Sequence, residues 1–175
     1  FGVAIPFEVK KYIPVPMEEI VLDWSVIGKI ATIIPPSSAK TGAATKLEST
    51  QVLVVAVPKE VVNKYVQVAK LAGLDLLTLE HESFSLARSL VGNDLGLYLI
   101  IDIGLRGSSL IVVDNGFVML SHTLEKGDQQ AICAEIRKVV GLYKMRYNKN
   151  IKNCILVGGM DRTSLTSYVA VCLTE

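Results

Sequence analysis

The sequence predicts an α/β fold made of two pieces, and three observations lead to this prediction. Short apolar segments of strand length recur along the chain, and all are far shorter than the ~20 residues that a membrane-spanning helix needs. Amphipathic helical patterns alternate with these segments. The run from Gly92 to Gly96 is the clearest boundary, because glycine, asparagine and aspartate favour turns. We therefore expect one piece over residues 1–92 and another over residues 96–175.

Composition limits what this chain can do. Half of its 175 residues are hydrophobic and 20% are charged, so it can bury a core. The net charge of +1 gives no argument for nucleic acid or an anionic membrane as a partner. Neither His81 nor His122 has a partner at the spacing of a hydrolase triad or a metal centre. The three scattered cysteines suggest buried thiols in a reducing compartment.

The first piece combines strands with helices. Residues 12–16 are expected to be extended, because each proline disfavours helix in the residue before it. Pro58 opens a helix whose apolar stripe includes Val61 and Tyr65, and Gly73 ends it. The elements expected here are a helix at 7–12, strands at 19–26, 51–57 and 74–79, a flexible connection at 35–50, and helices at 58–72 and 83–91.

The second piece begins with three strands in quick succession. The pair Asn115-Gly116 predicts a tight hairpin between the second and third strands, because both residues accept a positive φ at little cost. A long helix with a buried apolar stripe at Ile132, Ile136, Val139, Val140 and Tyr143 follows. The expected elements are strands at 97–103, 108–114 and 117–124, a helix at 131–147, a strand at 154–157 and a helix from about residue 163.

Asp102, Gly104, Gly107 and Ser108 form an Asp-x-Gly turn between two of these strands. A carboxylate at a strand end can hold Mg²⁺, usually through water. The two glycines would leave backbone N–H groups open to a phosphate, and the serine could add a hydroxyl. The alternative is a plain hairpin turn, which is favoured on the turn alone because aspartate and glycine are common turn residues.

Gly158 and Gly159 follow the last strand and lead toward a helix. They would let a purine or a ribose approach the backbone, or they could simply form a tight turn. Asp161 at the helix start would repel a phosphate, so a base or sugar is the better expectation there. Together with the Asp102 turn, these glycines predict half of a nucleotide cleft.

Basic residues gather around the long helix of the second piece. Glu135 is the only acidic residue nearby, and no aromatic residues alternate with the charges as they do in many nucleic-acid surfaces. A solvated helix face is therefore favoured, and neither a nucleic-acid partner nor direct membrane insertion is expected. The residues are Arg137, Lys138, Lys144, Arg146, Lys149 and Lys152.

The order of these pieces resembles the PilM family, the actin-like proteins of type IV pilus assembly, which are relatives of the division protein FtsA. The residues that carry the resemblance are 7–24 (FEVKKYIPVPMEEIVLDW), 56–62 (AVPKEVV), 72–74 (AGL) and 82–88 (ESFSLAR). The Asp102 turn is similar to the family's second phosphate loop, and Gly158-Gly159 is similar to its adenosine motif. The similarity covers nearly the whole chain in collinear order.

The resemblance implies an actin-like (ribonuclease H-like) half-core with a small inserted α+β subdomain. Residues 1–92 would be the subdomain called 1C, and residues 96–175 would be subdomain 2A. The family's subdomains 1A and 2B are not recognisable in this sequence. ATP and Mg²⁺ are therefore implied for the family, with Asp102, Gly104, Gly107, Ser108, Gly158 and Gly159 as one half of the binding site. Asp102 would hold the metal through water.

The resemblance also implies a partner. In this family the N-terminal tail of PilN, an inner-membrane protein, binds a groove that 1C helps to form. Phe7, Tyr12, Ile13 and Trp24 are the candidate partner-binding residues, with ordinary core packing as the alternative for each. The chain would then be cytoplasmic and peripheral at the inner membrane through PilN and other pilus platform proteins.

Three functions stay open on these grounds. The leading one is a pilus-assembly scaffold, the second is an FtsA-like cytoskeletal role in cell division, and the third is a fragment of a sugar or acyl kinase. A kinase needs both phosphate loops and a catalytic carboxylate beside its substrate, whereas this sequence shows one loop. No turnover is therefore expected from this chain alone.

Overall fold

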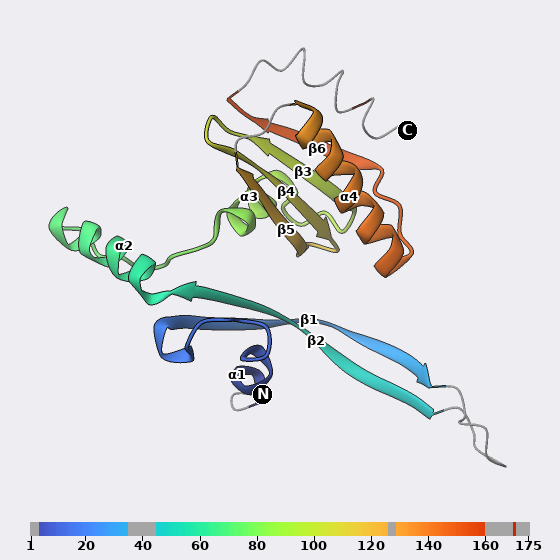
Figure 1. The fold of residues 1–175 in the computed structure, drawn as a ribbon, viewed down its shortest axis with the longest axis horizontal. Coiled ribbons are helices and arrows are strands. Elements are labelled where there is room, and N and C mark those ends of the chain that lie inside the picture. The colour runs from blue at the N-terminus through green and yellow to red at the C-terminus, as the bar shows by residue number, and fades with distance from the viewer. Residues whose placement is uncertain (1–3, 35–44, 126–128, 160–169, 171–175) are drawn as a thin grey trace. The chain divides into compact units, whose positions relative to one another are not determined.

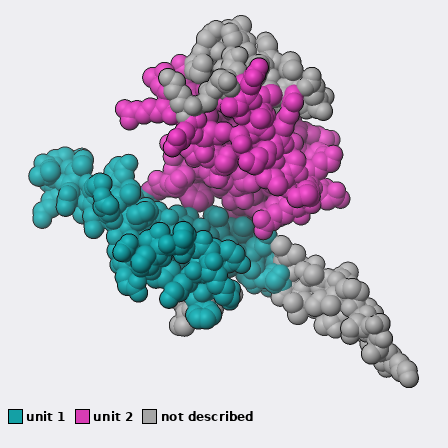
Figure 2. All heavy atoms as spheres, viewed as in Figure 1, with its two compact units in different colours: residues 1–79 teal, residues 80–175 magenta. Residues whose placement is uncertain are grey.

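The computed structural model describes residues 4–34, 45–125, 129–159 and 170 of the chain. Figure 1 shows the order of its helices and strands, and Figure 2 colours its two compact units, Phe1–Leu79 and Glu80–Glu175. The units divide at Leu79 rather than near Gly92, so the helix expected at 83–91 belongs to the second unit. The identification of the two units with subdomains 1C and 2A stays a prediction.

A long two-stranded sheet dominates unit 1. Strands β1 (Ile20–Ile34) and β2 (Thr45–Pro58) pair antiparallel, with an irregularity between Val26 and Gly28. Their many β-branched residues suit this conformation. The connection predicted at 35–50 extends too far along the chain, because residues 45–50 are already in β2. Cross-strand pairing orders these residues, and composition alone does not reveal such pairing.

Two α-helices accompany the sheet of unit 1. The first, α1 (Ala4–Val9), begins before the helix expected at 7–12, and a 3₁₀ turn, η1, covers Met17–Glu19. The second, α2 (Lys59–Leu71), starts directly after Pro58 as predicted. Gly73 ends it in a left-handed conformation (φ 68°), and the Leu74 N–H donates to the Ala69 carbonyl at 2.9 Å. This is a Schellman motif.

The strand predicted at 74–79 is wrong, because these residues lie outside every helix and strand. An extended segment becomes a strand only when a neighbour pairs with it, and no described strand does so here. The apolar stripe of α2 is likewise uncovered, since none of its residues is buried. The sequence shows the apolar pattern of residues 74–79 and of α2, but a pattern does not show whether other residues pair with the segment or cover its apolar side chains.

Unit 2 is built on a four-stranded mixed sheet in the order β5-β4-β3-β6. Strands β3 (Leu97–Ile103), β4 (Gly107–Asp114) and β5 (Phe117–Glu125) run antiparallel, and β6 (Asn153–Gly158) runs parallel to β3. Asn115 (φ 53°) and Gly116 (φ 78°) form the predicted tight turn between β4 and β5.

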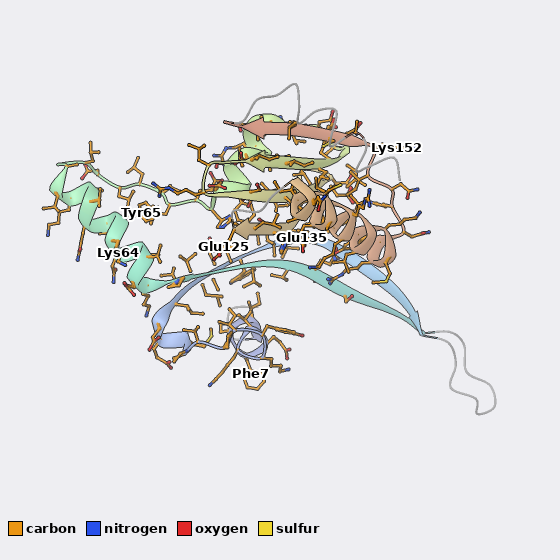
Figure 3. The ribbon with its side chains drawn as sticks, turned by 45° about the horizontal axis from the view of Figure 1, so that its top comes forward. Phe7, Lys64, Tyr65, Glu125, Glu135 and Lys152 are labelled. Carbon is orange, nitrogen blue, oxygen red and sulfur yellow. The ribbon has the colours of Figure 1, made fainter. Side chains whose placement is uncertain are left out.

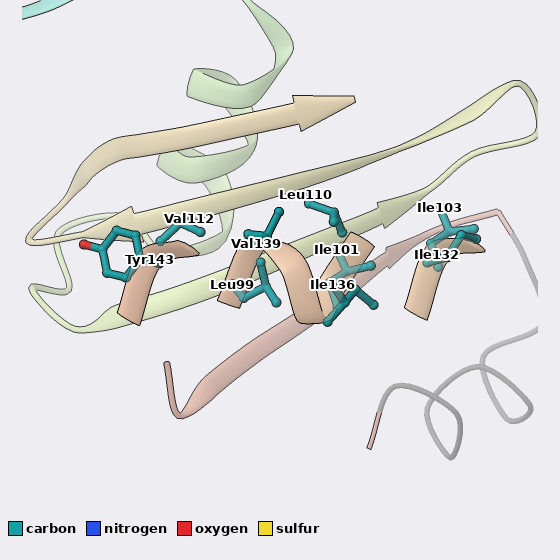
Figure 4. Packing of buried hydrophobic residues seen from close by; sticks show 9 residues of the cluster. All are labelled: Leu99, Ile101, Ile103, Leu110, Val112, Ile132, Ile136, Val139 and Tyr143. Carbon is teal, nitrogen blue, oxygen red and sulfur yellow. The ribbon is translucent and has the colours of Figure 1, made fainter. Parts of the chain in front are cut away.

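Helices cover both faces of this sheet, because successive strand residues point to opposite sides. Helix α4 (Gln129–Tyr147) packs Ile136 and Tyr143 against Leu99 and Ile101 on one face, as Figure 4 shows. Helix α3 (Glu82–Leu90) packs Ala87 in the cluster on the other face. The sequence therefore predicted the buried stripe of α4 correctly.

Two of the three cysteines differ from the expectation of buried thiols, and Cys172 lies outside the described residues. Cys133 in α4 is disulfide-bonded. Cys154 in β6 is an exposed free cysteine. Spacing along the sequence does not report which cysteines the fold brings within bonding distance. Within the part of the chain that the structure describes, no helix is long and apolar enough to cross a membrane.

Candidate functional site

The Asp102 turn and the Gly158-Gly159 turn lie side by side at one end of the unit 2 sheet. Ile103, the last residue of β3, pairs with Ser108 on one side and with Gly158 on the other. The Gly159 N–H donates to the Ile103 carbonyl at 3.1 Å. Two motifs that lie far apart in sequence therefore meet at one strand end, as a half-cleft requires.

The glycines of this site are present for different reasons. A Cβ on Gly158 would lie 2.1 Å from the Ile103 carbonyl oxygen, and a Cβ on Gly107 would lie 2.6 Å from that of Leu124. Close backbone packing requires glycine at both positions. A Cβ on Gly104 would lie 3.1 Å from the Gly107 carbonyl oxygen, whereas one on Gly159 would meet no described atom within 4 Å. Of these four glycines, Gly159 is thus the one with open space in front of it as far as the described residues show.

Asp102 and Ser108 point to opposite faces of the sheet. Ser108 is buried on the α4 side together with its pairing partner Ile103. Asp102 shares the α3 side with its own partner, Ser109, whose hydroxyl donates to Glu82 at 3.4 Å. Because side chains alternate along a strand, the carboxylate has Ser109 rather than Ser108 beside it.

Glu82 is the residue of this site that sequence reasoning missed. It is the first residue of α3, where His81 caps the helix by accepting a hydrogen bond from the Ser83 N–H at 3.3 Å. Burial raises the pKa of the Asp102 carboxyl above its usual range, and the nearby Glu82 charge raises it further. Its place in the ESFSLAR segment, at the start of a helix, was the available signal.

Two neighbouring carboxylates create an electrostatic demand for a cation. The structure supplies only part of a metal site, since no three acidic, histidine or cysteine side chains converge among the described residues. The same side of the sheet also holds neutral contacts, such as the Ser83 and Ser121 hydroxyls at 2.6 Å from each other. The arrangement can therefore form one wall of a magnesium and phosphate site.

An apolar groove of about 510 Å³ lies between α1 and β2 in unit 1. From β2 the residues Val52, Val54 and Ala56 line it, because alternate residues of a strand share one face. From α1 and the turn after it come the remaining lining residues, Ile5, Glu8, Val9, Tyr12 and Ile13. This is a hydrophobic slot of the kind that holds a short apolar peptide.

Four residues were predicted to bind a partner, and the structure places them differently. Tyr12 and Ile13 line the groove. Trp24 pairs with Val54 across the sheet, so it lies on the groove side and is 37% exposed. Phe7 is 70% exposed and does not line the groove; its ring lies 5.7 Å from the Lys11 ammonium (Figure 3).

Most of the groove wall was missed from sequence. The alternation of Val52, Val54 and Ala56 within β2 predicts only a strand and does not say what faces it. Ile5 lies before the helix predicted at 7–12, so its place four residues from Val9 on α1 was not predicted. The apolar patterns of α1 and β2 are both present in the sequence, but only the packing of α1 beside β2 shows that they face one another.

Comparison with known proteins identifies the family to which the chain belongs. It resembles a chain of a solved structure described as "PilM-PilN type IV pilus biogenesis complex", with a TM-score of 0.72 and 19% identity. The likeness covers 98% of this chain and 59% of that chain, and at this identity it shows a common fold and confirms the α/β class. No curated protein matches significantly. A family model described as type IV pilus assembly protein PilM matches residues 2–153. The chain therefore belongs to the PilM family of type IV pilus assembly proteins.

Proposed function

We propose that this chain is a scaffold of type IV pilus assembly whose unit 1 binds the N-terminal tail of a PilN-like inner-membrane protein. The observation that carries the proposal is the apolar groove between α1 and β2. The solved relative comes from a PilM-PilN complex, which supports this choice of partner. In this proposal the protein works in the cytoplasm and reaches the inner membrane through PilN and other platform proteins.

The chemistry of the groove suits an extended apolar tail. Among the lining residues that the structure describes, Glu8 is the only charged one, and its carboxylate is already paired with the Lys11 ammonium at 2.8 Å. Strand β2 pairs only with β1 among the described strands, so its other edge can offer N–H and C=O groups to an added strand. Main-chain hydrogen bonds would then hold the tail while alternate side chains enter the groove.

A titration of a synthetic PilN-tail peptide tests the proposal. We expect Val54→Asp to weaken binding at least about tenfold, because the groove would then contain an unpaired charge. Leu53→Asp is the matched control, since Leu53 lies next in the strand but on the opposite face, where it pairs with Ser25. Tyr12→Ala adds a variant that leaves the core intact, because Tyr12 is 82% exposed.

The control decides the outcome. If the Val54→Asp variant and the unmodified chain bound the peptide with equal affinity, the groove would not be the binding site. Equal loss in the Leu53→Asp variant would show a general effect on the sheet rather than a site. A circular dichroism spectrum of each variant establishes that the fold is retained, so a loss of affinity is a loss of contact.

A second proposal concerns ATP, which the family resemblance implies. We propose that Asp102 and Gly159 form one wall of an ATP and Mg²⁺ site, with Glu82 as a further acidic group. The adjacent turns, the open space before Gly159 and the raised pKa of Asp102 support it. A bound Mg²⁺ would supply positive charge to the phosphates.

Calorimetric titration of Mg-ATP into this chain tests the second proposal. It should give binding that Asp102→Ala weakens, because the variant removes the carboxylate that would hold the metal through water. Asp75→Ala, at an exposed position in unit 1, is the control and should leave the affinity as it is. An unchanged affinity of Asp102→Ala would remove Asp102 from the site.

The match to the PilM family favours the scaffold over the two alternative functions. A division role of the FtsA kind and a kinase both share the α/β class, so the fold by itself does not separate them. The apolar groove suits the docking of a peptide and gives no support for phosphoryl transfer, which needs both phosphate loops and a catalytic carboxylate beside the substrate. Turnover of a small substrate in the presence of Mg-ATP would reverse this order.

A further inference from the structure

Charge is segregated along this chain, although its total is nearly neutral. Residues 129–152 contain six basic side chains and one acidic side chain, Glu135. The rest of the chain contains twelve basic and sixteen acidic residues. The net charge of +1 therefore hides one strongly basic segment and a chain that is otherwise acidic. A local surface can attract an anionic partner even when the total charge predicts nothing.

The fold exposes most of these basic side chains on the outer side of α4. Helix α4 packs against the sheet through Ile132, Ile136, Val139 and Tyr143, so its other side faces away from the sheet (Figure 1). Arg137 and Lys144 are seven residues apart and share a helix face, and Lys138 lies beside them. All three are exposed. The basic helix face consists of Arg137, Lys138 and Lys144, with Lys152 beyond the helix end. Arg146 lies to one side of this face, with its guanidinium 5.6 Å from the centre of the Tyr147 ring.

Part of this charge has no acidic partner among the residues of unit 2 that the structure describes. Lys138 is paired with Glu135 at 3.2 Å, and Lys149 is bonded to Asp114. By contrast, the side-chain ammonium groups of Lys144 and Lys152 make no hydrogen bond or ion pair to any residue that the structure describes. Figure 3 labels Lys152, which lies beyond the end of α4, and Glu135, the acidic residue that pairs with Lys138. Lys144 and Lys152 are therefore available to an external anion.

Two apolar side chains lie among the cations. Leu142 is 44% exposed and Met145 is 78% exposed, although both belong to a helix whose inner side packs against the sheet. Leu142 follows Lys138 by four residues and Met145 follows Leu142 by three, so the three side chains share the outer face. This combination suits the surface of a phospholipid bilayer. Flexible aliphatic groups can enter the layer near the hydrocarbon, while lysine side chains extend to the lipid phosphates.

We propose that the basic helix face of α4 binds an anionic phospholipid surface peripherally, without spanning it. Cations would contact the lipid phosphates, and Leu142 and Met145 would enter the headgroup layer. A nucleic acid fits less well, because single strands stack on exposed aromatic rings. Tyr143 is buried, and Tyr147 packs against it with ring centroids 4.7 Å apart. The surface lies in unit 2, whereas the apolar groove lies in unit 1.

Vesicle co-sedimentation tests this proposal with the whole chain. We expect binding to vesicles in which about a third of the lipid is phosphatidylglycerol, and none to pure phosphatidylcholine. Lys144→Glu combined with Lys152→Glu should lower the partition coefficient about tenfold or more, because each lysine contributes about a factor of five near such a surface. Lys64→Glu combined with Lys70→Glu changes net charge equally on α2 and should lower it far less.

Three outcomes would overturn the proposal. The first is equal binding to neutral and anionic vesicles, and the second is an equal loss in the α2 control. The third is binding to a DNA duplex but not to vesicles, which would assign the surface to nucleic acid. Met145→Gln should weaken vesicle binding severalfold without altering charge. Val54→Asp should bind vesicles normally, so failure of the groove proposal and failure of this one are distinguishable.

Discussion

The two units of this molecule bury their apolar residues to very different degrees. In unit 2, Leu99, Ile101 and Leu110 on one sheet face and Ile100 and Ile111 on the other are fully buried. Among the described residues of unit 1, only Ile5, Val9 and Ile20 are buried hydrophobics, and α2 has no buried residue at all. Yet both units have sequences with the periodicity of packed helices and strands.

This difference shows that hydrophobic periodicity marks the side chains that can be buried, but does not show whether other residues bury them. Unit 2 satisfies both sheet faces within its own residues. Among its described residues, unit 1 has a two-stranded sheet whose outer edges pair with no other strand, an architecture that is marginal in water by itself. Its remaining apolar surface, including Leu71, Leu74 and Leu77, is available to further polypeptide. Unit 2 is therefore expected to be the more stable unit, and unit 1 the unit whose apolar surface can bind further polypeptide.

The largest predicted effect contrasts two leucines. Leu99→Ala in β3 should lower the free energy of unfolding by about 3 kcal/mol or more, because Leu99 is 0% exposed and a cavity would remain. Leu77→Ala in unit 1 should change it by less than about 0.5 kcal/mol, because Leu77 is 92% exposed. Urea denaturation followed by far-ultraviolet circular dichroism measures both.

The single tryptophan of the chain makes this comparison sharper. Trp24 lies in unit 1, so its fluorescence follows that unit while circular dichroism follows both. We expect the two denaturation curves not to coincide, with the Trp24 transition at the lower urea concentration. If the fluorescence and circular dichroism curves coincided and Leu99→Ala shifted both equally, the two units would unfold together. The contrast in burial would then not make one unit less stable than the other.

A second contrast uses two glycines with positive φ. Gly158→Ala should cost more than about 2 kcal/mol, because the new Cβ would lie 2.1 Å from the Ile103 carbonyl oxygen at φ 124°. Gly73→Ala should cost about 1 kcal/mol, because its φ is also positive (68°) but nothing lies within 4 Å of the new Cβ. Amide hydrogen exchange would locate each loss, at β6 and at the end of α2 respectively. Equal costs would mean that the strand end tolerates the displacement of Ile103.

A smaller effect is expected from the polar contact that ties α4 to the β4–β5 turn. The Tyr143 hydroxyl donates to the buried Asp114 carboxylate at 2.7 Å, and Lys149 and Asn115 also contact this carboxylate. Tyr143→Phe should cost about 1–2 kcal/mol, because one partner of a buried charge is lost while two remain. Thermal unfolding at neutral pH measures it.

The same tyrosine predicts a dependence on alkaline pH. Burial, followed by the hydrogen bond to Asp114, raises the pKa of Tyr143 above its usual value. The stabilisation is therefore fully present below the unfolded-state pKa of about 10 and is lost as the pH rises above it. Tyr143→Phe should flatten this decline, with Tyr98, whose pKa is also raised by Asp94, keeping part of it. An unchanged decline in the variant would remove Tyr143 as its cause.

Sequence reasoning succeeded where a local pattern decides the structure. The Asn115-Gly116 turn, the Gly73 helix end and the stripe around Ile136 all depend on neighbours in the chain. It also placed the Asp102 turn near Gly158-Gly159, because each motif lies at the end of a predicted strand, and Ile103 pairs with Gly158. It failed where distant segments meet. The pairing of Ser109 rather than Ser108 with Asp102, the Glu82 charge and the β2 wall of the groove depend on register and packing, which no single segment encodes.

The smallest effect has the opposite sign and bears on function. Asp102→Asn should raise the free energy of unfolding at pH 7 by less than about 1 kcal/mol, because burial and Glu82 both disfavour the carboxylate. The raised pKa means that the native state favours the protonated form, so the gain should vanish as the pH falls below about 4. Asp75→Asn, at an exposed position in unit 1, should change nothing at either pH. A loss of stability in Asp102→Asn would mean that the charged group is held by contacts that favour it, and a cation would no longer be needed to balance this strand end.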